Sequence, residues 1–200
     1  MTGANPLKTT IQTYDHSAGL YADNIWEMQL DGLLDAFNSR LTAGGCVLDL
    51  GCGPGRDTDH LQARGLDAFG LDLSFGMLQE AKKRTPWNFV QGDMRQLPLP
   101  AGQLDGVWLS AALLHLPRPT APQALQEVHR VLKSGGVLFL GVKQGTGESW
   151  QESKLGQRFF IYYELDEIRN LIQAAGFQVV EEWESPGSVG MWLNLVAKVI

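Results

Sequence analysis

Short apolar runs alternate with amphipathic patterns along most of the chain. The apolar runs are CVLDL at residues 46–50, DAFGLDL at 67–73, WNFVQGD at 87–93, the start of LDGVWLSAALLHL at 104–116 and GVLFLGVK at 136–143. Between them, helical periods cover residues 56–65, 75–84 and 121–136. This alternation is typical of βαβ units, in which helices cover both faces of a parallel sheet. The pattern therefore predicts an α/β fold.

Residues at the ends of the helical segments support these assignments. Gly65 is expected to end the first helix in a left-handed conformation. Ser74 is expected to cap the helix over 75–84, since a serine hydroxyl can accept from a free backbone amide. Lys133 and Gly135 are typical closing residues for the third helix.

Residues after 143 and before 45 depart from this alternation. Residues 143–160 are polar, contain glycine and show no clear period, which predicts a long loop over one end of the sheet. After a helix at 166–176, two apolar runs at 177–183 and 191–199 predict a closing hairpin. A helical pattern at 24–41 predicts that residues 1–44 pack beside a sheet built from residues 45–200.

Composition limits the class of protein. The chain has 200 residues, 44% hydrophobic and 19% charged, without a long apolar span, which fits one folded domain and argues against membrane insertion. A net charge of -6 disfavours nucleic acid as a partner. The two cysteines, Cys46 and Cys52, cannot form a disulfide framework or a four-ligand zinc site, so no metal is expected. Because the N-terminal residues lack a secretory pattern, we expect a cytoplasmic protein.

A glycine-rich turn follows the first apolar run. In LDLGCGPG, residues 48–55, the glycines are spaced G-x-G-x-G, and Arg56 takes the place where a dinucleotide fingerprint has a third small residue. Pro54 removes a backbone donor, and Asp49 would repel a pyrophosphate. The turn therefore favours a cationic or zwitterionic ligand.

Two acidic residues come at the ends of the next strands. Asp72 lies 19 residues after Gly53, near the spacing at which a carboxylate accepts hydrogen bonds from a ribose diol. Asp93 could accept from an exocyclic amine, and Met94 could pack on an aromatic base. Together these residues predict an adenosine-containing ligand.

The motifs VLDLGCGPG, GLDLS, QGDMRQLPLP and VLKSGGVLFLGV, in this order, resemble those of the class I S-adenosylmethionine-dependent methyltransferases. The resemblance covers residues 14–200 in the order of the expected helices and strands, and its strongest motifs lie between residues 46 and 142. Within that superfamily it is similar to the small-molecule branch that includes bacterial quinone-biosynthesis methyltransferases. It implies a Rossmann-like, doubly wound sheet of seven mostly parallel strands with an antiparallel last strand.

The resemblance also implies S-adenosylmethionine as cofactor, S-adenosylhomocysteine as product, and a set of binding residues. The methionine part would meet Gly51, Cys52, Gly53, Asp49 and Ser110; the ribose would meet Asp72; and the adenine would meet Leu73, Met77, Asp93 and Met94. Tyr14 and Tyr21 would place aromatic faces near the sulfonium, in an N-terminal segment that the family uses as a lid.

Fewer residues are candidates for acid-base catalysis or for contact with the substrate. His115, just past the fourth strand, could act as a general base, or it could be a packed histidine bonded to backbone. Three residues could border the substrate pocket or be structural: Lys143, Tyr162 and Tyr163. Arg158 could bind an acidic substrate or be a solvated cation.

The sequence therefore predicts a methyltransferase that acts on a small molecule by direct displacement. The fourth strand ends in LSAALLHLP without the motif of nucleobase N-methylases, which disfavours that class. Two alternatives are a non-catalytic S-adenosylmethionine-binding module and an NAD-binding oxidoreductase. The sequence does not identify the methyl acceptor, the attacked atom or the oligomeric state.

Overall fold

The structure is a computed structural model that describes residues 5–28 and 30–200. The helices are α1 (Pro6–Ile25), α2 (Asp31–Asn38), α3 (Arg56–Ala63), α4 (Phe75–Arg84), α5 (Ala121–Val131) and α6 (Leu165–Ala174), with short 3-10 turns η1 (Leu113–His115) and η2 (Arg118–Thr120). The strands are β1 (Cys46–Leu50), β2 (Asp67–Asp72), β3 (Phe89–Gln91), β4 (Leu104–Ser110), β5 (Leu132–Lys143), β6 (Glu148–Ser153), β7 (Gly156–Ile161), β8 (Phe177–Pro186) and β9 (Met191–Val199).

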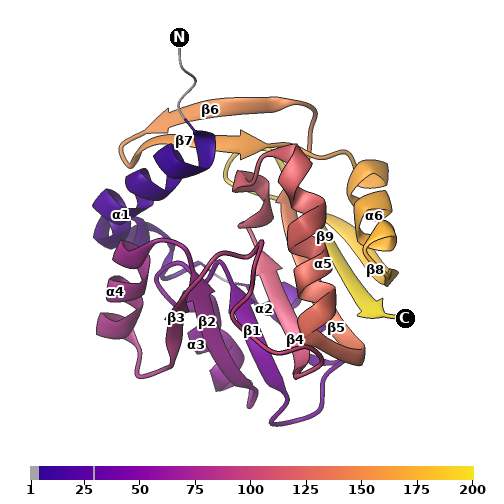
Figure 1. Cartoon of the computed structure of the whole chain (residues 1–200). Coiled ribbons are helices and arrows are strands. Elements are labelled where there is room, and N and C mark those ends of the chain that lie inside the picture. The colour runs from indigo at the N-terminus through magenta and orange to yellow at the C-terminus, as the bar shows by residue number, and fades with distance from the viewer. Residues whose placement is uncertain (1–4, 29) are drawn as a thin grey trace.

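Seven of these strands form one sheet in the order β3-β2-β1-β4-β5-β9-β8 (Figure 1). The pairs from β3 to β5 are parallel, whereas β9 runs antiparallel to both β5 and β8. The predicted mostly parallel, seven-stranded sheet, its antiparallel last strand and its closing hairpin are confirmed. Strand order reverses between β1 and β4, which is where doubly wound sheets bind ligands beyond the carboxyl ends of their strands.

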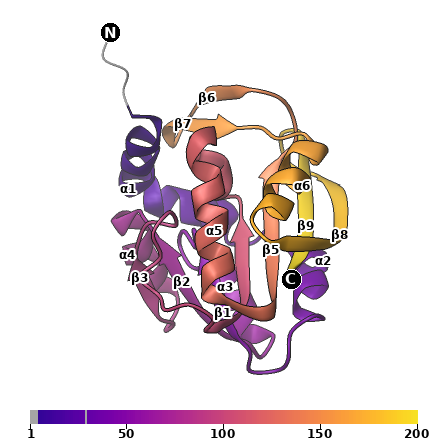
Figure 2. The same ribbon diagram turned by 45° about the vertical axis from the view of Figure 1, so that its right-hand side comes forward.

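Helices cover the sheet on both faces (Figures 1 and 2). Successive strand residues point to opposite faces, so Leu48 belongs to the cluster beneath α5 and α6, while Val47 belongs to the cluster beneath α2 and α3. The predicted capping is also confirmed: the Ser74 hydroxyl accepts from the Met77 amide, and Gly65 has a φ of 80°. Within the described residues, no helix is long and apolar enough to span a membrane.

The boundary between α5 and β5 differs from the prediction. The helix ends at Val131, so Lys133 and Gly135 lie in the strand rather than closing the helix. Gly135 has a φ of 73°, and a Cβ on Gly136 would lie 2.8 Å from the Lys133 carbonyl oxygen. The glycines therefore shape an irregular start to β5, where the register against β4 shifts.

The prediction of a long loop at 143–160 is wrong, because most of this segment forms the antiparallel β6–β7 hairpin. The hairpin lies above the carboxyl ends of the sheet strands, beside α1 (Figure 1). Trp150 of β6 pairs across the ladder with Phe159 of β7, with ring centroids 5.3 Å apart. Since much of β6 faces solvent, its polar residues concealed the strand.

The N-terminal helical pattern is split into two helices. The pattern expected at 24–41 breaks after Ile25, and residue 29 lies outside the described residues. Helix α1 starts earlier than predicted, at Pro6, and is attached to the hairpin. The Phe159 amide donates to the Thr10 hydroxyl at 3.0 Å, and the Thr13 hydroxyl donates to the Gln157 carbonyl at 2.7 Å. Helix α1 is thereby positioned over the carboxyl ends of β1 and β4, where the strand order reverses.

Candidate active site

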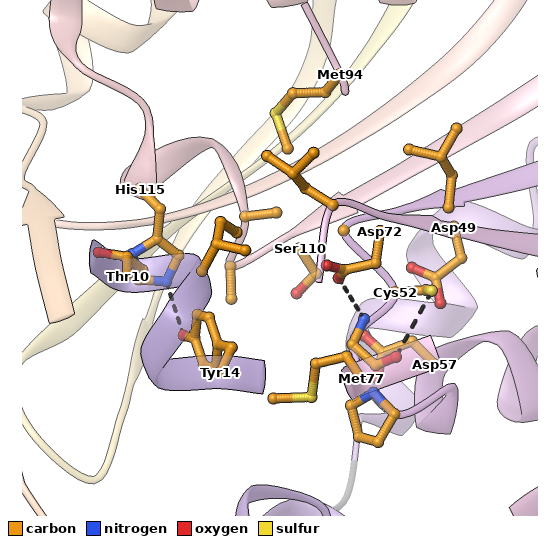
Figure 3. A pocket seen from close by; sticks show the side chains of 18 of the residues that line it. Thr10, Tyr14, Asp49, Cys52, Asp57, Asp72, Met77, Met94, Ser110 and His115 are labelled. Atoms are coloured by element: carbon orange, nitrogen blue, oxygen red, sulfur yellow. Dashed lines mark hydrogen bonds between the residues drawn. The ribbon is translucent and has the colours of Figure 1, made fainter. Parts of the chain in front are cut away.

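A cavity opens at the carboxyl ends of β1, β2 and β4, beneath α1 (Figure 3). The structure brings all thirteen predicted site residues to the lining of this one cavity: Tyr14, Tyr21, Asp49, Gly51, Cys52, Gly53, Asp72, Leu73, Met77, Asp93, Met94, Ser110 and His115. They come from segments far apart in the sequence. Their convergence is the geometric basis for a binding site, while the role of each remains a prediction.

The glycine-rich turn forms the floor of the cavity. Gly51 and Gly53 have φ angles of 78° and 53°, a conformation that side-chain-bearing residues rarely adopt. A Cβ on Gly51 would lie 2.3 Å from the Cβ of Ala112, so the two backbones can approach only because Gly51 has no side chain. A Cβ on Gly53 would meet nothing closer than Tyr21, at 3.9 Å. Gly53 therefore faces open space that a ligand can fill.

Asp72, at the end of β2, is held by backbone donors. One carboxylate oxygen accepts from the Gly53 amide at 2.8 Å, and the other accepts from the Ser74 amide at 2.8 Å. Burial raises the pKa of this carboxyl, although the backbone hydrogen bonds oppose the shift. Because each carboxylate oxygen has more than one lone pair, Asp72 keeps the capacity to accept from ligand hydroxyls.

Two further acidic residues lie on the same side of the cavity. Asp49 is 2% exposed and accepts a 2.6 Å hydrogen bond from the Thr58 hydroxyl. Burial, and then the nearby charge of Asp57, raise the pKa of Asp49. Asp57, which the sequence analysis missed, accepts from the Trp108 indole at 2.8 Å and pairs with Arg56. This acidic wall, formed by Asp49 and Asp57, suits a cationic ligand group.

Asp93 is paired with a neighbouring arginine. Its carboxylate accepts from the Arg95 Nε at 2.9 and 3.1 Å and from the Arg95 backbone amide at 2.9 Å. The Arg95 side-chain hydrogen bonds lower the pKa of Asp93. Any ligand amine would therefore share Asp93 with Arg95, a partner that the sequence analysis did not identify.

Tyr14 and His115 form a hydrogen-bonded pair on the opposite side of the cavity (Figure 3). The Nδ1 atom of His115 lies 2.7 Å from the Phe159 carbonyl oxygen, which can only accept, so Nδ1 carries the proton. In the neutral ring, Nε2 then accepts from the Tyr14 phenol at 2.8 Å. Burial lowers the pKa of His115 to about 4. The ring is therefore neutral near pH 7, packed and bonded to backbone.

The comparisons with known proteins agree with this geometry. Residues 47–136 match the family described as methyltransferase domain. A malonyl-[acyl-carrier protein] O-methyltransferase of Serratia marcescens is 31% identical over 68% of this chain and 55% of its own length. A demethylmenaquinone methyltransferase of Renibacterium salmoninarum is 38% identical over 47% of this chain and 39% of its own length.

This chain is therefore similar to methyltransferases, most clearly over residues 47–136. It spans about half the length of the curated relatives it matches. Its fold matches the 1,6-didemethyltoxoflavin-N1-methyltransferase of Burkholderia thailandensis, whose structure holds 1,6-didemethyltoxoflavin and S-adenosylhomocysteine. The TM-score is 0.77, with 20% identity over 100% of this chain and 92% of that one.

The residues present fit S-adenosylmethionine, the cofactor of the methyltransferases that this chain resembles. A Cβ on Gly53 would project into the open space in front of the turn, toward Tyr21, where a ligand can approach the backbone closely. The acidic wall at Asp49 and Asp57 complements an ammonium and a sulfonium, and the Tyr14 and Tyr21 rings, 5.3 Å apart, can face a cation. Cys52 is buried, and burial raises the pKa of its thiol, which argues against a nucleophile.

Some lining residues of this cavity could not be found from the sequence pattern. Ala111, directly after β4, has a φ of 57°, an unusual conformation for a residue with a side chain. It lines the cavity with Ala112 and Thr10, none of which carries a motif signal. Of the predicted pocket-border residues, Tyr163 is buried beneath the Arg118 guanidinium, and Tyr162 bonds to Gln151. Neither lines this cavity.

Proposed function

We propose that this chain binds S-adenosylmethionine and transfers its methyl group to a small-molecule acceptor. The observation that carries the proposal is the Asp72 carboxylate, bonded to the Gly53 amide at the floor of a cavity whose other side is formed by Tyr14 and His115. This arrangement offers one ligand a carboxylate that accepts from hydroxyl groups, an acidic wall and aromatic faces. A nucleoside that carries a sulfonium has groups that match all three.

The proposed contacts follow the chemistry of each side chain. Asp72 accepts from the ribose hydroxyls; Leu73, Met77 and Met94 pack on the adenine and Asp93 accepts from its amine; Gly51, Cys52, Gly53, Asp49 and Ser110 surround the methionine part. All of these residues line the cavity, which supports their assignment to one ligand.

The bound cofactor supplies a methyl group on a positively charged sulfur, which is already an activated leaving group. The protein residues then have to orient the acceptor and exclude water. We assign Tyr21 to the wall beside the reacting atoms. His115 can take a proton at Nε2 when the Tyr14 phenol turns away, because Nδ1–H stays bonded to the Phe159 carbonyl.

We further propose that the N-terminal segment, residues 1–44, acts as a lid on a core of residues 45–200. Residues 1–4 and 29 of this segment lie outside the described part of the chain. The proposal is supported by α1, which contributes Tyr14 and Tyr21 to the cavity and is held from both sides. Asp15 accepts from Ser74 at 2.6 Å, while Thr13 bonds to the β6–β7 hairpin.

A small molecule is the proposed acceptor class. The named relatives act on a malonyl group on a carrier protein and on demethylmenaquinone, and the structural neighbour on 1,6-didemethyltoxoflavin. The net charge of -6 gives no general basic surface for a nucleic acid substrate. A cytoplasmic location remains a prediction.

Calorimetry with S-adenosylmethionine, S-adenosylhomocysteine and NAD tests the binding step. We expect both sulfur compounds to bind and NAD not to bind. Tight NAD binding without S-adenosylmethionine binding would overturn the proposal in favour of the oxidoreductase. Transfer of radiolabelled methyl to acceptors is then measured, since cofactor binding without transfer to any acceptor would favour the non-catalytic binding module.

A further inference from the structure

Arg158 of β7 differs from the other arginines of the chain. The sequence contains nine arginines, and eight of them lie within 4.0 Å of a carboxylate. Within residues 5–28 and 30–200, Arg158 has no such partner: the one hydrogen bond of its side chain is to the Tyr14 phenol, at 3.4 Å. Its Nε atom is buried and has no hydrogen-bond partner. Arg158 therefore has donors that the described structure does not use.

The Arg158 guanidinium instead lies against aromatic rings. Its central carbon is 5.6 Å from the centroid of the Tyr14 ring and 5.3 Å from that of Phe160. Phe160 packs edge-on against His115, with centroids 4.8 Å apart. Arg158 is thus placed next to the Tyr14–His115 pair that borders the cavity.

A second cation lies against the same ring. Lys143, the last residue of β5, has its Nζ 4.7 Å from the centroid of Phe160, and no carboxylate pairs with it in the described residues. Burial, together with the charge of Arg158, lowers the pKa of Lys143. Lys143 lies at the carboxyl end of its strand, the edge where ligands bind in doubly wound sheets.

Two half-buried cations without a counter-charge repel each other, and an anion between them would remove that cost. Arg158 and Lys143 do not line the cavity themselves but lie behind Tyr14 and His115, which do, whereas the acidic wall of Asp49 and Asp57 lines the other side. An anionic acceptor would be repelled from that wall and attracted to the cation pair. The charge distribution therefore favours a cationic ligand group at the acidic wall and an anionic one next to Tyr14 and His115.

We propose that the methyl acceptor is a small organic acid whose carboxylate lies between Arg158 and Lys143. The inference rests on the proposed function. A carboxylate matches the planar fork of an arginine, whose donors it can accept in pairs. The body of the acid would extend past Phe160 and Tyr14 toward His115, where the apolar lining includes Leu116.

Matched pairs of acids and neutral amides test this inference. Benzoate, phenylacetate and octanoate, each beside its primary amide, are titrated by calorimetry into the protein with and without saturating S-adenosylhomocysteine. We expect at least one acid to bind about tenfold or more tightly than its amide, because a charge-assisted hydrogen bond contributes at least that factor. Added salt should weaken this preference.

Variants assign the preference to the two cations. Arg158→Gln and Lys143→Gln should each lower the affinity for the acid severalfold and reduce the preference over the amide, while Arg158→Lys should keep part of it. Lys154→Gln removes an exposed lysine from the turn of the same hairpin and should change nothing. Circular dichroism and the melting temperature establish that each variant is folded.

Three results would overturn the inference: no acid binds better than its amide, Arg158→Gln keeps the full preference, or phenyl phosphate binds more tightly than benzoate. Titration of S-adenosylhomocysteine into the same samples shows whether only the inference about the acceptor fails or the proposed function fails as well. Loss of the acid preference with intact S-adenosylhomocysteine binding contradicts only the acceptor class. Absence of S-adenosylhomocysteine binding contradicts the cofactor assignment itself.

Discussion

The carboxylate of Asp72 accepts a 2.8 Å hydrogen bond from the backbone amide of Gly53. This bond joins the end of β2 to the turn after β1, 19 residues earlier in the chain. The second oxygen of Asp72 accepts from Ser74, which caps α4. One side chain therefore sets the positions of the turn, a strand end and a helix start around the cavity.

Asp72→Asn should weaken binding of S-adenosylhomocysteine about tenfold or more. The amide removes the charge, and its NH₂ group would face a backbone donor at Gly53 or Ser74. Calorimetry measures the loss. Asp67→Asn, at the exposed start of the same strand, is the control and should bind like the wild type. Equal affinities in two folded variants would contradict this role for Asp72.

Gly51→Ala should destabilise the protein by about 2 kcal/mol more than Gly44→Ala. Both glycines have positive φ angles, 78° and 74°, so both substitutions cost backbone strain. Only at Gly51 would the new Cβ collide with Ala112, whereas at Gly44 nothing lies within 4 Å. Urea unfolding gives the two free energies. If they are the same, the turn can move away from Ala112 without cost.

His115 should make the free energy of unfolding depend on pH. Its folded pKa of about 4 lies below the usual value near 6.5, so the unfolded chain takes up a proton first as the pH falls. The stability from the neutral ring is present above pH 6.5 and is lost toward pH 4, by about 1 kcal/mol per pH unit. Asp49 and Asp72 have raised pKa values and act in the opposite direction.

Comparison with His115→Gln isolates this effect, since the acidic residues are common to both proteins. The groups that face the ring are the Tyr14 phenol, Arg158 and Lys143, and the charges of the last two also lower its pKa. The stability advantage of the wild type should shrink between pH 6.5 and pH 5. Nitrogen chemical shifts that report ring protonation with a midpoint near 6.5 would refute the assignment.

Asp15→Ala should loosen α1 over the cavity. Asp15 accepts from the Ser74 hydroxyl at 2.6 Å and from the Gly76 amide at 2.9 Å, so the variant leaves two donors of α4 without this partner. We expect faster amide hydrogen exchange in α1 and a free energy of unfolding lower by about 1–2 kcal/mol.

Asp23→Ala is the matched control for this change. It removes an exposed ion pair with Arg84 farther along the same helix and should cost less than about 1 kcal/mol. If both variants exchange alike along α1, the contact with Ser74 does not hold the helix in place.

Local patterns explain why much of this fold was predictable. The strand and helix periods around the glycine-rich turn and the Ser74 cap depend on neighbouring residues, so the sequence displays them directly. The β6–β7 hairpin was missed because β6 faces solvent and lacks an apolar face. The φ of Ala111 and the hydrogen bond from the Trp108 indole to Asp57, 51 residues apart, depend on the assembled sheet edge, which no short segment encodes.

The attachment of α1 to β7 also has a consequence for how the protein is made. Thr10 and Phe159 are separated by 149 residues, and Thr13 and Gln157 by 144. A ribosome produces α1 well before its partner strand β7. During translation α1 therefore has no hairpin to dock on, and a truncated product that stops before β7 cannot complete the wall that Tyr14 forms with His115.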